Sequence, residues 1–150
     1  MLKPRLLLIE DADHRIQTFT RWLQGSDFVL VVCRSGGQAK GMLAHGGAEV
    51  IAGVLLDHDL TDARITEADH HLSSTDVLPL LATRLHRWTP ILIHSHNPVQ
   101  APKMHRALAT AGMEVTQVPF SDLVSEAFDQ WLMTVRDHWD DVACELSGKG

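Results

Sequence analysis

The stretch that decides the fold is residues 50–60, VIAGVLLDHDL. Its run VLL is apolar without alternation, which is typical of a strand buried on both faces in a parallel sheet. The chain then changes within one residue to Asp57, His58 and Asp59. Because ligands bind at the carboxyl ends of strands in open α/β sheets, and buried charges need partners, these residues predict a metal or substrate site. The alternative interpretation is that they only begin a solvated loop.

Composition bounds the class of protein. The chain has 150 residues, 45% of them hydrophobic and 21% charged, which is ordinary for one globular domain spanning residues 1–150. Thirteen basic and nineteen acidic residues give a net charge of −6. This balance argues against non-specific DNA binding and against charge-driven attachment to membranes. An anionic substrate held through a metal stays compatible with it.

Cysteine usage and hydropathy bear on location. Cys33 and Cys144 form no spacing motif, which favours a reducing cytoplasm. The first residues, MLKPRLLLIE, have too short an apolar core and too early a carboxylate for a signal peptide. No stretch approaches the roughly 20 apolar residues of a membrane span. We therefore expect a cytoplasmic protein with no membrane partner.

Apolar runs alternate with helical patterns along the chain. The runs predict five strands, at 5–9, 28–33, within 50–60, 91–94 and 115–118. Strands that alternate with helices form parallel sheets with right-handed crossovers. The sequence therefore predicts an α/β, flavodoxin-like, doubly wound sheet of five parallel strands in the order 2-1-3-4-5.

Capping residues and glycines mark the predicted helix ends. Suitable N-caps are Asp13, Ser35, Thr75 and Ser121, and suitable stops are Gly25, Gly46-Gly47 and Gly112. The helix capped by Thr75 should run to about Trp88, with Pro79 in its first turn. A further helix is expected at 101–111. The longest helix should begin at Ser121 and carry an apolar stripe, typical of a core or a dimer face, formed by Val124, Phe128, Trp131, Val135, Trp139 and Val142.

The predicted strand order brings acidic residues together. The first and third strands are neighbours at the switch point, and they end in Glu10-Asp11 and in Asp57. Three carboxylates there offer the hard oxygen ligands that suit Mg²⁺ or Mn²⁺. The alternative is a metal-free acidic pocket in which one carboxyl has a raised pKa. Asp59 either supports such a site from outside the ligand set or caps the turn.

Four short motifs resemble the response-regulator receiver domain over nearly the whole chain. LLLIEDAD, LLDHDL and PILIHS are similar to its first, third and fourth strands, and VPF to its lysine-proline-phenylalanine signature. The resemblance implies a phospho-accepting role for Asp57 and a hydroxyl role for Ser95. Val118 stands where the lysine that pairs with the phosphoryl group belongs, so the resemblance gives no support to phosphorylation-driven switching.

A second resemblance is more specific. LDHDL at 56–60, HSHNP at 94–98 and the downstream Met104 resemble the receiver-derived family proposed to process cyclic phosphates, although Ser73-Ser74 replace a glycine usual there. This resemblance implies a metal-assisted phosphoesterase that acts on a cyclic or terminal phosphate, on a small phosphate ester or an RNA end. The rival hypothesis is a non-catalytic, atypical receiver that binds a partner protein or a second copy through its C-terminal helix.

Four residues near the predicted pocket are candidates for catalysis. His58 and His94 are expected to serve as general base and acid on a phosphoester, although either one taken singly could be a structural histidine. Ser95 would point toward Asp57 and donate to a phosphoryl oxygen. Asn97 is a further candidate, but capping of the next helix explains it equally well. His70 and His71, in the acidic segment 61–74, suit either a lid or second metal site or a solvated loop.

Overall fold

A computed structural model describes residues 3–45, 48–57 and 77–148, with side chains described up to residue 142. Five strands form one parallel sheet in the predicted order β2-β1-β3-β4-β5. Their bounds are β1 Arg5–Ile9, β2 Val29–Cys33, β3 Ile51–Leu56, β4 Ile91–Ile93 and β5 Val115–Gln117. The predicted flavodoxin-like, doubly wound fold is confirmed.

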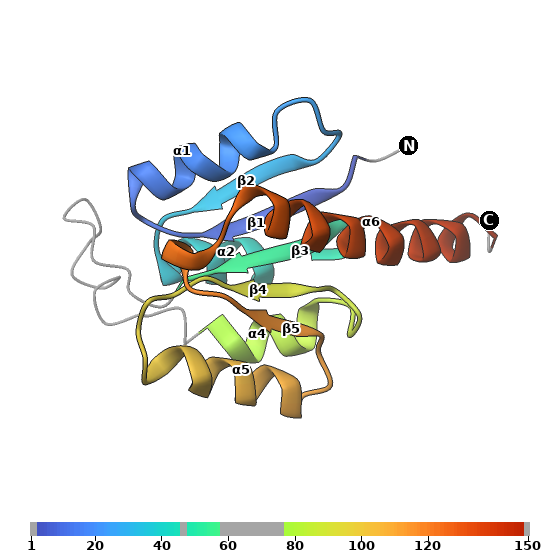
Figure 1. The fold of residues 1–150 in the computed structure, drawn as a ribbon. Coiled ribbons are helices and arrows are strands. Elements are labelled where there is room, and N and C mark those ends of the chain that lie inside the picture. The colour runs from blue at the N-terminus through green and yellow to red at the C-terminus, as the bar shows by residue number, and fades with distance from the viewer. Residues whose placement is uncertain (1–2, 46–47, 58–76, 149–150) are drawn as a thin grey trace.

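Helices cover both faces of the sheet (Figure 1). On one face lie α1 (Asp13–Trp22) and α6 (Ser125–Gly148), and on the other α2 (Gly36–Ala44), α4 (Leu78–Arg84) and α5 (Gln100–Thr110). Two short 3₁₀ turns, η1 (Ala48–Val50) and η3 (Phe120–Asp122), precede β3 and α6. Leu6 and Leu8 enter the core under α1 and α6, whereas Leu7 and Ile9 enter the opposite core. This alternation explains why β1 reads as a continuous apolar run.

One glycine sets the distance between α6 and the sheet. A Cβ on Gly53 would lie 3.0 Å from Leu6 Cδ2 and 3.1 Å from atoms of Trp131 and Val135. The central strand β3 therefore has no room for a side chain where α6 crosses it. The missing side chain lets Trp131 and Val135 of the helix pack against the strand itself.

The start of the last helix differs from the prediction. Ser121 lies in the turn η3, and α6 begins at Ser125. Two backbone bonds explain the later start: Phe120 N donates to His94 O at 2.9 Å, and Asp122 N donates to Pro119 O at 2.9 Å. Val124 consequently precedes the helix and is 53% exposed. The rest of the predicted stripe is buried or half-buried in the core beneath α6: Phe128, Trp131, Val135, Trp139 and Val142.

Other helix ends were predicted with mixed success. Ser35 caps α2 as expected by accepting a bond from Gln38 N at 3.1 Å, and Gly112 adopts a φ of 88° after α5. The Asp13 prediction is wrong, because Ala12 is the N-cap of α1 and Asp13 pairs instead with Arg34 at 2.8 Å. The helix α4 ends at Arg84 rather than near Trp88, since the backbone turns extended at the next residue. Thr75 and Gly46-Gly47 lie outside the described residues.

Candidate functional site

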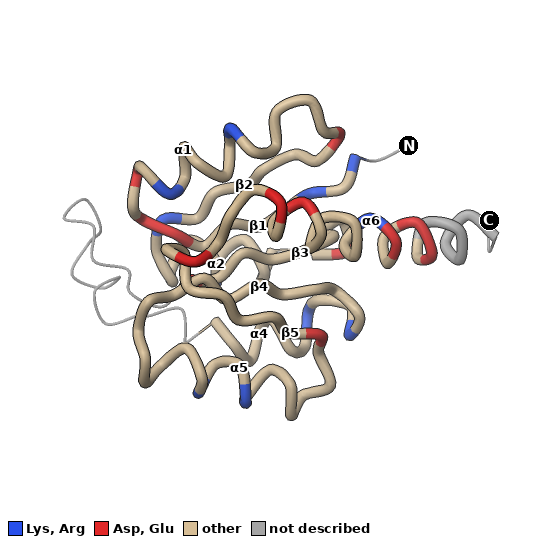
Figure 2. The backbone as a smooth tube through the Cα atoms, in the orientation of Figure 1, with Lys and Arg blue, Asp and Glu red and all other residues tan. Residues whose placement is uncertain are grey.

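Three ionisable side chains meet at the carboxyl edge of the sheet. Glu10 follows β1, Asp57 follows β3 and His94 follows β4, three strands that are neighbours in the sheet. One potential ligand atom from each lies within 4.8 Å of the others, and all three residues are buried. Acidic positions gather where β1 passes into α1 (Figure 2). The fold thus assembles this cluster from segments as much as 84 positions apart.

Glu10 is held firmly through both carboxylate oxygens. Oε2 accepts from the backbone N–H groups of Asp11 at 3.0 Å and of Ala12 at 3.4 Å. Oε1 faces Arg15 Nη1 at 3.3 Å and His94 Nε2 at 3.1 Å. The backbone therefore fixes one oxygen, and the other points into the cluster.

His94 is a neutral imidazole in this environment. Complete burial lowers its pKa to about 4, so at neutral pH its Nε2–H donates to Glu10. The ring packs edge-on against Phe19 with 5.1 Å between centroids. Its Nδ1 is buried and has no hydrogen-bond partner among the described residues. A lone pair is thus left unused inside the protein, at an energetic cost.

Asp57 has the opposite shift. Burial, and next the negative charge of Glu10, raise the pKa of its carboxyl to about 7. Oδ2 lies 3.6 Å from Arg15 Nη1, while Oδ1 is buried and has no partner within the described part of the chain. The pKa of the Asp57 carboxyl is thus higher than the pKa of the His94 imidazole, the reverse of the ordinary order.

Arg15 is the residue that sequence reasoning missed. It lies in the first turn of α1, with its side chain 18% exposed, and contacts both Glu10 and Asp57. Its guanidinium carbon lies 5.2 Å from the centroid of the Phe120 ring, a cation–π distance. The available signal was a basic residue in the first turn of a helix that directly follows an acidic strand end. The helix dipole favours acidic residues in the first turn of a helix and disfavours basic ones. An arginine in that turn therefore indicates an acidic partner nearby.

The remaining predicted residues lie around this cluster. Asp11 is buried beside it and its carbonyl accepts from Arg34 Nη1 at 3.3 Å, but its carboxylate is not among the three grouped ligand atoms. Ser95 is also buried, and its Oγ accepts from Asn97 N at 3.1 Å.

Asn97 makes the side-chain bonds of a capping residue, although the N-cap position of α5 is Val99. Its Oδ1 accepts from Val99 N at 3.0 Å and from Gln100 N at 2.8 Å, at the start of α5. The catalytic roles of Ser95 and Asn97 stay predictions. Four other predicted residues lie outside the described residues: His58, Asp59, His70 and His71.

The donor set fits a divalent cation. Two carboxylates and one imidazole are ligand types found around Mn²⁺ and, for the oxygens, Mg²⁺. Asp57 Oδ1 and His94 Nδ1 are buried acceptors with no partner among the residues that the structure describes, which is the state expected of groups that lack a positively charged partner. The geometry therefore supports a metal site at Glu10, Asp57 and His94.

Solved structures place this fold in the receiver class. The chain is 18% identical to the signal receiver domain of a putative Luxo repressor protein from Vibrio parahaemolyticus, with a TM-score of 0.67 over 95% of this chain and 98% of that one. A sensor histidine kinase receiver from Pseudomonas aeruginosa, with magnesium in its active-site cleft, is 16% identical, with a TM-score of 0.58 and coverages of 87% and 95%. The Mn²⁺-bound response regulator Rcp1 is 21% identical, with a TM-score of 0.54 and coverages of 85% and 88%.

Sequence comparison is more specific. The profile of the cyclic-phosphate processing receiver domain matches residues 5–110, which covers β1 through α5. This chain belongs to that family. Comparison with curated proteins gave no match. Across the described ranges, no helix combines the length and the apolar character needed to cross a membrane.

Proposed function

We propose that the protein is a metal-assisted phosphoesterase that acts on a cyclic or terminal phosphate of a small phosphate ester or an RNA end. One observation carries the proposal: Glu10, Asp57 and His94 bring three buried ligand atoms within 4.8 Å of one another at the edge where α/β sheets bind ligands. Membership of the cyclic-phosphate processing family supports the substrate class.

Glu10, Asp57 and His94 would hold Mg²⁺ or Mn²⁺. When bound, such an ion supplies positive charge that neutralises and polarises a phosphate group. The bonds from Asp11 N and Ala12 N keep Glu10 in place for this role. Asp11 and Asp59 stay sequence-based predictions for further ligands or for supporting positions.

The structure changes the role we propose for His94. With a pKa lowered to about 4 and Nε2 engaged by Glu10, it is a poor proton donor at neutral pH and a better ligand or positioning group. Proton transfer to or from the phosphoester then falls to His58, which stays a prediction because it lies outside the described residues. Ser95 and Asn97 would bind phosphoryl oxygens near the start of α5.

The rival function is a non-catalytic receiver-like module. The receiver fold and Val118 in the lysine position are compatible with it. A partner protein or second copy would dock on α6, where Met133 is 67% exposed. The aromatic stripe of this helix is already packed on the sheet, which leaves less apolar surface for such a partner.

The test is hydrolysis of a panel of 2′,3′-cyclic nucleotides and terminal nucleotide phosphates, with Mg²⁺ or Mn²⁺ and with a chelator. Wild type should hydrolyse a member of the panel only when metal is present. Asp57→Asn should hydrolyse it at least about 100-fold more slowly. Asp27→Asn is the matched control, because Asp27 is an exposed carboxylate at the opposite edge of the sheet. Absence of turnover on the whole panel would contradict the proposal and favour the binding module.

A further inference from the structure

Arg15 occupies the place that a metal would need. Oε2 of Glu10 is engaged by backbone N–H groups, so Oε1 is the oxygen left for a cation. Arg15 Nη1 lies 3.3 Å from that Oε1 and 3.6 Å from Asp57 Oδ2. A single guanidinium therefore bridges the two carboxylates of the metal cluster. A divalent cation bound by these carboxylates would lie close to the Arg15 guanidinium, and the two positive charges would repel at this distance.

Arg15 also has unused binding capacity. Its Nε is buried and has no acceptor within the described ranges, so one N–H donor goes unsatisfied. The guanidinium carbon lies 5.2 Å from the centroid of the Phe120 ring, and a stacked guanidinium of this kind donates its hydrogen bonds in its own plane. A guanidinium presents several N–H groups in one plane, which matches two oxygens of a phosphate. Val118 stands where the receiver resemblance places a phosphate-binding lysine, whereas Arg15 is a cation that the structure does bring to Asp57.

We propose that Arg15 has two successive partners: the carboxylates of Glu10 and Asp57 while no metal is bound, and the phosphate group of the substrate once a divalent cation has taken those carboxylates. The second half rests on the proposed function. Arg15 thereby links the two binding events. Metal binding frees the guanidinium, and the freed guanidinium neutralises the incoming phosphate.

The first experiment is calorimetric titration of Mg²⁺ into wild type, Arg15→Gln, Arg15→Lys and Arg21→Gln. It is run at pH 8, where the Asp57 carboxyl is ionised. Arg15→Gln should bind Mg²⁺ about three- to tenfold more tightly, because the competing positive charge is gone. Arg15→Lys keeps the charge and should stay near wild type. Arg21, exposed in the last turn of the same helix, is the matched control and should have no effect.

The second experiment titrates inorganic phosphate into the same four proteins at saturating Mg²⁺. Arg15→Gln should bind phosphate at least about tenfold more weakly, and Arg15→Lys should fall between, because lysine lacks the planar pair of donors. Wild type without Mg²⁺ should bind phosphate weakly, since its guanidinium is then held by the carboxylates. Thermal melts followed by circular dichroism confirm that each variant is folded, and Arg15→Lys carries the test if the glutamine variant is not.

The results that overturn the proposal are specific. Equal or weaker Mg²⁺ binding in Arg15→Gln would show that Arg15 positions the carboxylates rather than competing for them. Unchanged phosphate binding in that variant would show that Arg15 does not contact the anion, and absence of Mg²⁺ binding in all four proteins would remove the basis of both halves. No turnover is measured here, so a failure of the hydrolysis panel would contradict the proposed activity while leaving opposite shifts in Mg²⁺ and phosphate affinity as support for Arg15.

Discussion

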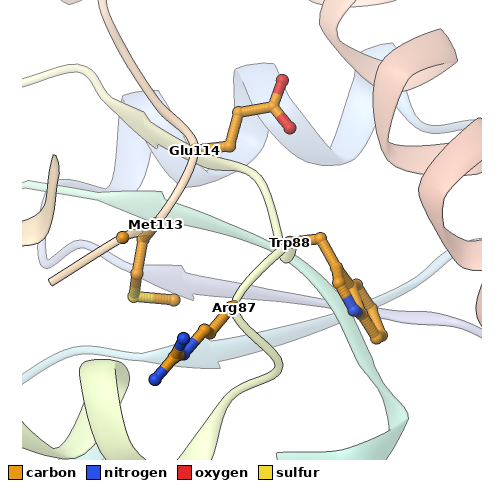
Figure 3. A pocket seen from close by; sticks show the side chains of 5 residues that line it. Arg87, Trp88, Met113 and Glu114 are labelled. Carbon is orange, nitrogen blue, oxygen red and sulfur yellow. The ribbon is translucent and has the colours of Figure 1, made fainter.

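The two edges of the sheet treat charge in opposite ways. At the carboxyl edge, Glu10, Asp57 and His94 are buried together, and two of them have a polar atom with no partner in the described part of the chain. At the amino edge, a hollow of about 300 Å³ opens beside β4 and β5 (Figure 3). It is lined by Arg87, Trp88, Gly112, Met113 and Glu114.

The charged residues of the hollow are exposed, and Glu114 is already paired with His138 at 2.7 Å. Exposed charges and pairs cost the fold little and so carry little information about function. Buried ionisable groups destabilise the folded state unless something compensates them, so their presence indicates a ligand. The difference teaches that desolvated charge, not open space, marks the candidate site in this molecule.

The largest expected effect is a loss of activity in histidine variants at the carboxyl edge that a histidine variant at the amino edge does not show. His58→Ala removes the proposed proton-transfer group and should lower kcat/KM on the active cyclic nucleotide about 10²–10⁴-fold without changing Mg²⁺ binding. His94→Ala removes a proposed metal ligand and should lower kcat/KM and also weaken Mg²⁺ binding. His138→Ala, at the amino edge, should leave both unchanged. The double variant of His58 and His94 should lose little more than the worse single one, because groups that act together are not additive. A loss of similar size in His138→Ala would erase the distinction between the edges.

A smaller effect is expected on stability at the carboxyl edge. With its pKa raised to about 7, Asp57 favours folding most when protonated, and this contribution is lost as pH rises from about 4 through 7. Asp57→Asn should therefore be about 2–4 kcal/mol more stable than metal-free wild type at pH 8, and nearly equal to it at pH 4. Urea denaturation in the presence of a chelator measures the difference.

His94 supplies an internal check on that experiment. Its lowered pKa contributes stability above about 6.5 that is lost as pH falls toward 4, the opposite slope. The two slopes cancel in wild type between about pH 4 and 6.5, and Asp57→Asn should expose the slope of His94 alone. A stability difference that is the same at every pH would mean that Asp57 ionises normally in the folded protein.

The smallest effect is expected from the aspartate of the amino edge. The Asp27 carboxylate is paired with Arg136, which lowers its pKa, so the stability it contributes is present at neutral pH and lost as pH falls through the lowered pKa. Both partners are largely exposed, and Asp27→Asn should cost less than about 1 kcal/mol at pH 8. Repeating the denaturation in 1 M salt should remove most of this difference. A change in stability at pH 8 larger in size than that of Asp57→Asn would reverse the comparison.

The sequence predicted the sheet because its central strands are buried on both faces. Continuous apolar runs such as 5–9 and the VLL before Asp57 have few other interpretations, and the handedness of crossovers then limits the strand order. The start of α6 was not predictable in this way. It depends on the bond from Phe120 N to His94 O, a contact between two separate strand ends.

The sequence predicted which residues form the candidate site better than it predicted their protonation states and partners. Glu10, Asp57 and His94 could be named because each follows an apolar run, and strand ends converge at one edge. The residues next to a histidine in the sequence do not show whether its imidazole is buried, so the lowered pKa of His94 could not be predicted. Arg15 was missed because a basic residue on a helix is ordinary, and only the folded chain shows which carboxylates it faces.

The position of α6 has a consequence for the order in which the chain is made. Arg136 pairs with Asp27, just before edge strand β2, and His138 pairs with Glu114, just before edge strand β5. Phe128 and Val135 of this helix share a core with Leu6 and Leu8 of β1. Figure 1 shows the helix lying across this face of the sheet. A nascent chain that has emerged only as far as α5 therefore exposes the part of this apolar face that α1 does not cover to neighbouring nascent chains and chaperones. The strand β1 therefore stays partly uncovered until α6, a helix made much later, has been synthesised.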